Sequence, residues 1–136
     1  MKSRGLRNNN PLNIRHNAEH FQGEIKGRDK SFKTFSSLPF GYRAGIVILG
    51  TYLSRGLNTI EKIITKWAPP AENDTESYIS NVERWSGIPR NKQLTAIDGS
   101  DYILIVAAMS FVENGQNADI SAVQAGFNLQ TKIKIQ

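Results

Sequence analysis

The sequence of 136 residues contains no cysteine, only two histidines (His16 and His20) and no long apolar run. The absence of cysteine excludes a disulfide scaffold, a Cys-ligated metal site and a thiol nucleophile. With so few histidines, we expect neither a metal site nor a cofactor. No segment reaches the roughly 18 apolar residues that a membrane-spanning helix requires. Residues 1–7 are basic without an apolar stretch behind them, which argues against a signal peptide, so we expect synthesis in the cytoplasm.

Charge is distributed unevenly along the chain, whose net charge is +5. Residues 1–55 carry ten Lys and Arg against three Asp and Glu, whereas residues 56–136 carry seven against nine. A basic half is typical of proteins with an anionic partner, such as nucleic acid, a lipid surface or a cell-wall polymer. Composition alone favours the simpler interpretation of a solubilising surface.

Length and ordinary composition predict a single domain over residues 1–136, and the patterns favour a mainly α fold with minor short strands. Helices are indicated by capping residues, by apolar residues at three- and four-residue steps, and by terminating Gly or Pro residues. They are expected after Ser37 up to Gly56, from Asn58 to Trp67, from Asp74 or Thr75 to Gly87, from Asp98 or Ser100 through residues 102–112, and over residues 120–124.

Residues 102–112 are apolar at every position except Ser110. A helix that is apolar on all sides is a buried one, so we expect this segment to form the central helix of the domain. The preceding helix is expected to bury an apolar face that runs from Tyr78 to Trp85.

The first 35 residues and the last six are less regular. Residues 8–11, three Asn and a Pro, predict a structured loop. Alternating apolar residues indicate short strands at residues 12–14 and 32–35. Residues 131–135 alternate in the same way and are expected either to form a strand or to fray.

Glu113 directly follows the apolar segment and precedes Asn114 and Gly115. Apolar surroundings and the negative end of a helix dipole both raise a carboxyl pKa. A carboxylic acid that stays protonated near neutral pH can donate a proton to the leaving oxygen of a glycosidic bond. The alternative is an exposed Glu in the last turn of a helix.

Two further segments carry candidate binding groups. In the connection after the second helix, Trp67 and Tyr78 are able to stack on sugars, Asn73 can bond an acetamide, and Glu72 offers a carboxylate; the aromatics equally well complete apolar faces. In residues 8–15, which we call the Asn-rich loop, the planar guanidinium of Arg15 suits a carboxylate or phosphate. Asparagines there also close loops by local hydrogen bonds.

The chain resembles a group of bacteriophage and prophage proteins that are labelled virion structural proteins or peptidoglycan hydrolases. The matching segments are Gly5-Leu6-Arg7-Asn8-Asn9-Asn10-Pro11-Leu12-Asn13-Ile14-Arg15, Phe32 with Phe35, Gly41-Tyr42-Arg43-Ala44, Thr59-Ile60, Ile63-Ile64, Trp67 to Tyr78, and Glu113-Asn114-Gly115. The group usually has Gly in place of Leu12, where a positive φ is then allowed, and Ile in place of Tyr42.

The resemblance implies a single lysozyme-like domain that cleaves peptidoglycan glycan strands, as a lysozyme or a lytic transglycosylase. In related glucosaminidases and lytic transglycosylases, the catalytic Glu ends a buried helix and precedes a segment similar to Asn-Leu-Phe-Gly-Ile-Lys, which residues 10–15 resemble. Here that segment lies at the start of the chain, so we hypothesise a circularly permuted order in which Glu113 meets the Asn-rich loop in space.

We therefore predict Glu113 as general acid, with Glu72, and next Asp29, as candidates for a second carboxylate. The expected substrate-binding residues are Asn73, Tyr78, Asn13, Arg15 and Trp67. Action at the cell wall, in the periplasm or as part of a virion would follow.

Two alternatives remain. The first is a non-catalytic virion structural or assembly protein that binds other virion proteins. The second and weaker alternative is a nucleic-acid-binding module that uses Arg4, Arg7 and Arg15.

Overall fold

A computed structural model describes residues 2–136. The expected mainly α fold is confirmed, with six helices and one two-stranded sheet among these residues. The elements are α1 (Arg4–Arg7), β1 (Glu24–Ile25), β2 (Thr34–Phe35), α2 (Leu38–Ser54), α3 (Ile60–Trp67), α4 (Thr75–Ser86), α5 (Gly99–Asn114) and α6 (Ile120–Asn128).

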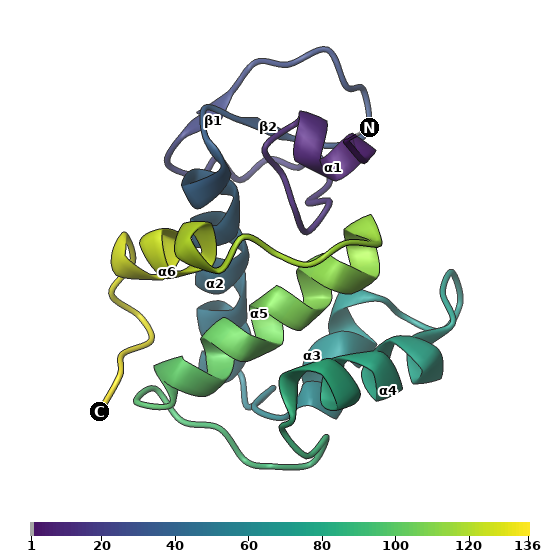
Figure 1. The fold of residues 1–136 in the computed structure, drawn as a ribbon, viewed down its shortest axis with the longest axis vertical. Coiled ribbons are helices and arrows are strands. Elements are labelled where there is room, and N and C mark those ends of the chain that lie inside the picture. The colour runs from purple at the N-terminus through teal and green to yellow at the C-terminus, as the bar shows by residue number, and fades with distance from the viewer. Residues whose placement is uncertain (1) are drawn as a thin grey trace.

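α5 crosses the middle of the molecule, with α2 and α6 on one side and α3 and α4 on the other (Figure 1). α6 packs along α2, α4 packs along α5, and α1 touches the C-terminal end of α5. The small sheet lies near α1, at one end of α2 (Figure 1). β1 and β2 are antiparallel, with Glu24 opposite Phe35. No helix in residues 2–136 meets the length and hydropathy that crossing a membrane requires.

The helix boundaries follow local chemistry where a cap and a stop are both present. Pro39 lies in the first turn of α2. Proline has no backbone N–H, but N–H groups in a first turn have no hydrogen-bond partner within the helix, so no bond is lost. Asp74 Oδ1 accepts a hydrogen bond from the Ser77 N–H and caps α4. Thr59, and not Asn58, caps α3 by accepting from the Lys62 N–H.

Some expectations about α4, α5 and α6 are wrong in detail. Leu104 on α5 is 44% exposed and Trp85 on α4 is 52% exposed, so neither helix buries its whole apolar surface. At the surface, Trp85 of α4 packs against the ring of Phe111 of α5. α6 does not end before Gly126 but continues through it to Asn128. Because Gly126 has no side chain, α6 can approach Pro39 and Tyr42 of α2 closely at this point.

The irregular regions also differ from the expectation. The predicted strand at residues 12–14 is absent, because the Asn-rich loop bends there; an isolated bridge joins Arg15 to Phe32 instead. Of residues 131–135, only Ile135 forms a bridge, with Asp98. The helical turn α1 was not expected from periodicity, since four residues are too few to show it.

Two glycines provide the space in which residues 9–13 lie. A Cβ on Gly41 of α2 would collide with the backbone oxygen of Asn9 and with Pro11. A Cβ on Gly5 of α1 would lie 2.6 Å from Asn13 Oδ1 and 2.8 Å from the Asn10 oxygen. The Asn-rich loop therefore docks directly against the backbones of α1 and α2.

We expect Gly41→Ala to lower the free energy of unfolding by about 1–3 kcal/mol, because the new methyl group meets backbone that cannot move independently. Urea unfolding of both proteins measures this difference. Ser54→Ala, at the exposed end of α2, is the control and should change stability by less than about 0.5 kcal/mol. A Gly41→Ala variant as stable as the wild type would contradict the close docking.

Candidate active site

The Asn-rich loop is closed by the side chain of Asn10, which is fully buried. Its Nδ2 donates to the backbone oxygens of Ile14 and Lys33, both at 2.9 Å, and its Oδ1 accepts from the Ile14 N–H. The loop needs positive φ at Asn9 (51°) and Asn13 (53°), a conformation that asparagine tolerates better than most residues. Leu12 does not require positive φ, so its replacement of Gly leaves the loop intact.

Asn114 attaches this loop to the C-terminal end of α5. Its Nδ2 donates to the backbone oxygen of Pro11 at 2.7 Å, and its Oδ1 accepts from Ser3 Oγ at 2.6 Å. Gly115 then caps α5 in the left-handed conformation and turns the chain away. One amide side chain thus joins the end of α5 to two points near the start of the chain, Ser3 and Pro11.

The carboxyl group of Glu113 lies between the Asn-rich loop and α4. Asn13 Nδ2 donates to Glu113 Oε1 at 2.8 Å, and the Tyr78 hydroxyl donates to Oε2 at 2.9 Å. The contact between Glu113 and the Asn-rich loop, which the permutation hypothesis required, is therefore present. Tyr78 is 8% exposed and contributes its hydroxyl to the site while its ring packs in the core.

Burial raises the pKa of Glu113 above the usual value of a Glu carboxyl. The hydrogen bonds from Asn13 and Tyr78 favour the ionised form and lower the pKa by a smaller amount. Interactions with Trp67 and with the positive charge of Arg15 act in the same direction as those hydrogen bonds. The net result is a carboxyl group that is held in place by donors but is easier to protonate than an exposed Glu.

Burial also raises the pKa of Tyr78 well above its ordinary value, and the negative charge of Glu113 adds to this effect. Tyr78 therefore remains a hydrogen-bond donor to Glu113 throughout the physiological pH range.

A groove of about 410 Å³ is lined by two residues that contact this carboxyl group, Asn13 and Trp67, whereas Glu113 itself is not among the lining residues. Three predicted binding residues line it: Asn13, Arg15 and Trp67. Sequence reasoning missed Glu19, Tyr52 and Arg55, which also line the groove. Periodicity could have suggested Tyr52 and Arg55 as neighbours at the end of α2, but no pattern places that helix end beside the Asn-rich loop.

The other predicted site residues lie elsewhere. Glu72 and Asn73 are exposed in the loop between α3 and α4 and do not line the groove. Asn73 Nδ2 donates to the Pro69 oxygen, so this amide closes its own loop. The roles of Glu72 and Asn73 stay predictions, because the groove that contains Asn13 does not include them.

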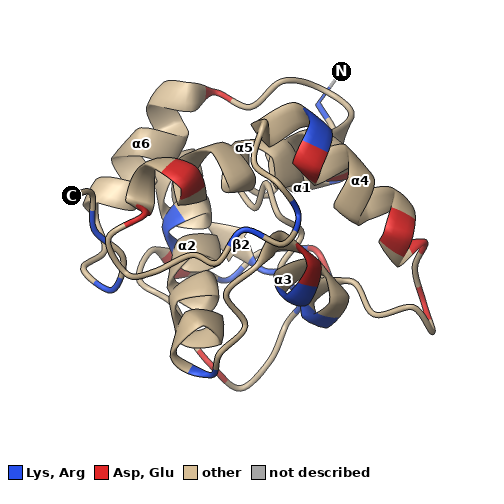
Figure 2. Cartoon of the chain, turned by 90° about the horizontal axis from the view of Figure 1, so that it is seen from below, with Lys and Arg blue, Asp and Glu red and all other residues tan. Residues whose placement is uncertain are grey.

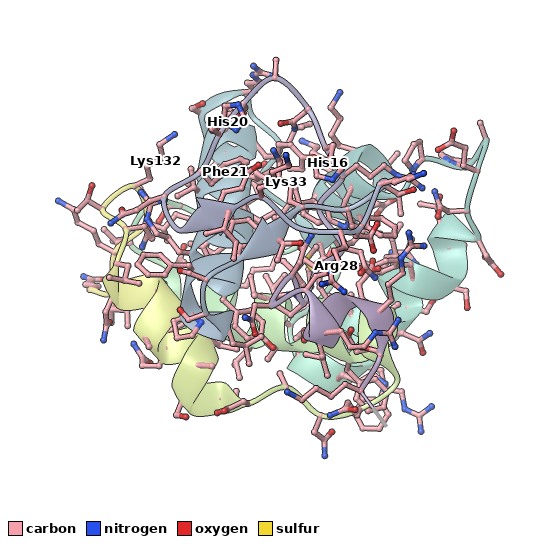
Figure 3. The ribbon with its side chains drawn as sticks, turned by 90° about the horizontal axis from the view of Figure 1, so that it is seen from above. His16, His20, Phe21, Arg28, Lys33 and Lys132 are labelled. Atoms are coloured by element: carbon pink, nitrogen blue, oxygen red, sulfur yellow. The ribbon has the colours of Figure 1, made fainter. Side chains whose placement is uncertain are left out.

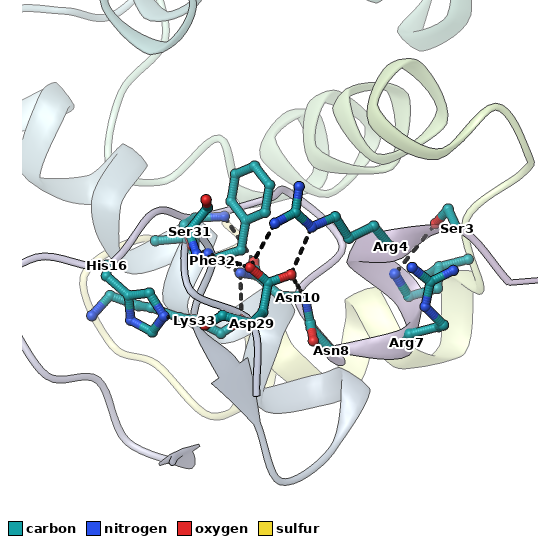
Figure 4. Close-up of polar contacts among 12 residues, drawn as sticks. Ser3, Arg4, Arg7, Asn8, Asn10, His16, Asp29, Ser31, Phe32 and Lys33 are labelled. Atoms are coloured by element: carbon teal, nitrogen blue, oxygen red, sulfur yellow. Dashed lines mark hydrogen bonds and ion pairs between the residues drawn. The ribbon is translucent and has the colours of Figure 1, made fainter. Parts of the chain in front are cut away.

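Asp29 is occupied by an ion pair (Figure 4). Both of its oxygens accept from the Arg4 guanidinium, at 2.7 and 2.8 Å, and Asn8 Nδ2 donates to Oδ2. The Arg4 guanidinium holds the pKa of Asp29 well below its usual range. An anion paired in this way is a poor proton acceptor. The ion pair instead connects α1 to the segment before β2.

Residues 2–136 contain no group of three or more His, Asp or Glu side chains arranged to hold a metal ion. No family model matches the chain. Protein P5 of Pseudoalteromonas phage PM2 is 45% identical to it over 120 residues, covering 85% of this chain and 73% of Protein P5. The chain belongs to the same family as Protein P5.

This relationship confirms the phage association that the sequence motifs predicted. The name Protein P5 describes no activity.

The raised pKa of Glu113 predicts a pH-dependent effect of Glu113→Gln on stability. A carboxyl whose pKa is higher in the folded than in the unfolded protein favours folding when protonated, and this contribution is lost as pH rises through the folded pKa. Since Gln mimics the protonated form, the variant should gain stability relative to the wild type as pH rises from below about 4.5.

Thermal unfolding from acid to neutral pH measures this effect. Glu72→Gln at an exposed position corrects for the general consequence of removing one negative charge. If the wild type instead becomes more stable relative to Glu113→Gln as pH rises, the fold favours the ionised carboxyl, which would contradict the raised pKa.

Proposed function

We propose that the chain is a phage-encoded enzyme that cleaves peptidoglycan glycan strands, and that its mainly α domain is lysozyme-like. The observation that carries the proposal is the placement of Glu113. A half-buried carboxyl group with a raised pKa is held by two donors, and one of them, Asn13, also lines a groove of about 410 Å³. This combination suits a general acid whose substrate is an extended polymer.

In the proposed reaction, Glu113 donates its proton to the glycosidic oxygen as the bond from that oxygen to the anomeric carbon breaks. Asn13 and Tyr78, which contact the carboxylate oxygens directly, stabilise the carboxylate that this transfer leaves. Water in hydrolysis, or the 6-hydroxyl of the same sugar in a transglycosylase reaction, then bonds to the anomeric carbon and gives up its proton to the Glu113 carboxylate, which restores the acid. The substrate's own N-acetyl group can assist where no second carboxylate does so.

Glu72 remains the predicted second carboxylate, and Glu19 is a further candidate because it is the acidic residue among those lining the groove. Asn13, Arg15 and Trp67 would contact the glycan in the groove, with Tyr78 acting through Glu113. Asn73 would require substrate that extends beyond the groove to the loop between α3 and α4.

A non-catalytic virion or assembly protein is the second candidate function. It is favoured by an exposed apolar hollow of about 360 Å³, lined in part by Trp85, Leu104 and Ile120, since exposed apolar patches mark interaction sites. Nucleic-acid binding has less support, because Arg4 is already paired with Asp29 and acidic and basic positions are interspersed along the ribbon (Figure 2).

Clearing of purified peptidoglycan suspensions tests the enzyme directly. We expect the wild type to clear walls and Glu113→Gln to lose at least about 100-fold in rate, because general acid catalysis contributes about 10²–10⁴-fold. Glu61→Gln, an exposed Glu on α3 outside the groove, is the matched control and should clear normally.

Mass spectrometry of the products separates hydrolysis from 1,6-anhydro formation. If both the wild type and Glu113→Gln clear walls equally, Glu113 is not the acid. If a folded wild type clears no wall of several types, the non-catalytic alternative is correct.

A further inference from the structure

The groove that Asn13 and Trp67 line carries a small excess of positive charge. Arg15 enters it from the Asn-rich loop, and Arg55 from the C-terminal end of α2. Both side chains are exposed, and neither forms an ion pair among residues 2–136. Glu19 is the acidic side chain among those that line the groove, so the lining has a net positive charge with His16 neutral.

A third cation extends this charge along the rim. Lys132 Nζ donates to Thr51 Oγ1 at 3.2 Å, and Thr51 lines the groove. Figure 3 shows Lys132 at the edge of the face that also presents His16 and Phe21. Arg15 and Arg55 therefore line one opening, and Lys132 lies next to it through its hydrogen bond to Thr51.

Aromatic rings form the apolar part of the same groove. Tyr52 and Trp67 meet edge to face, with ring centroids 6.5 Å apart, and Phe21 lies in the lining with them. Apolar ring faces pack against sugar rings, but they do not distinguish a neutral sugar from an acidic one. Arginine supplies that distinction, because its guanidinium binds a carboxylate through two parallel hydrogen bonds.

We propose that Arg55, together with Arg15, binds a carboxylate carried by the muramyl residue, so that the groove selects acidic aminosugar strands over neutral ones such as chitin. The inference rests on the proposed function, because it names the substrate feature recognised at the same site. The carboxylate is supplied either by the lactyl group of muramic acid or by the peptide attached to it. Arg55 is the specificity-determining residue, since Arg15 also acts on Glu113.

Binding measured by titration calorimetry tests this inference without requiring catalysis. The protein carries Glu113→Gln so that no ligand is consumed. The ligands are a peptide-free muramyl tetrasaccharide, the same oligosaccharide with its peptides, and chitotetraose. Arg55→Gln is added in one variant, and Arg84→Gln, an exposed Arg on α4 outside the groove, is the control with the same change in charge.

We expect tighter binding of the acidic ligands than of chitotetraose, and a preference that weakens as salt rises from about 0.05 to 0.5 M. Arg55→Gln should reduce that preference by about three- to tenfold, as for the loss of one exposed charge-assisted pair, whereas Arg84→Gln should not. A preference already present without peptide assigns the lactyl carboxylate, and one that needs the peptide assigns the peptide carboxylates.

Equal affinity for acidic and neutral ligands, no binding of either, or an unchanged preference in Arg55→Gln would overturn the inference. These outcomes are separate from the fate of the proposed function. Wall clearing without an Arg55-dependent preference overturns the specificity alone. An Arg55-dependent preference in a protein that clears no wall retains the ligand specificity and removes the catalysis.

Discussion

The docking of the Asn-rich loop onto the end of α5 is the contact on which the candidate site depends. The Asn114 side chain donates to the backbone oxygen of Pro11, and two residues later in the loop the Asn13 side chain donates to Glu113. The loop can lie there only because Gly5 and Gly41 present bare backbone to it. A change at either glycine would move Asn13 and so alter the environment of a carboxyl group about a hundred residues away in the sequence.

The environment of Glu113 combines two opposing effects. Burial disfavours the ionised carboxyl, whereas donors from Asn13 and Tyr78 favour it. Donors to a charged group are each worth about 1.5–3 kcal/mol, so they prevent burial from making the carboxylate prohibitively costly. A general acid needs this compromise, because the group must hold its proton before the reaction and tolerate a negative charge after it.

Local patterns were sufficient to predict α2 to α5 and the position of Glu113 at the end of α5, since caps, stops and apolar spacing all lie within short windows. They did not predict α1, whose four residues are too few for periodicity, or the passage of α6 through Gly126. The sequence suggested that the Tyr78 ring stacks on sugars, because it does not show that the Tyr78 hydroxyl points at Glu113. Arg55 was missed as a groove residue for the same reason, because its place in the lining depends on where α2 ends in space.

The protonation of Glu113 is the central claim, and it is measured most directly by NMR titration of the ¹³C-labelled Glu113 carboxyl in the wild type and in Tyr78→Phe. We expect a wild-type midpoint above the ordinary Glu value of 4.5 and a higher midpoint still in Tyr78→Phe, since the lost hydroxyl favoured the ionised form. A wild-type midpoint at or below the ordinary value would show that burial does not raise the pKa of Glu113, and Glu113 would lose its assignment as general acid.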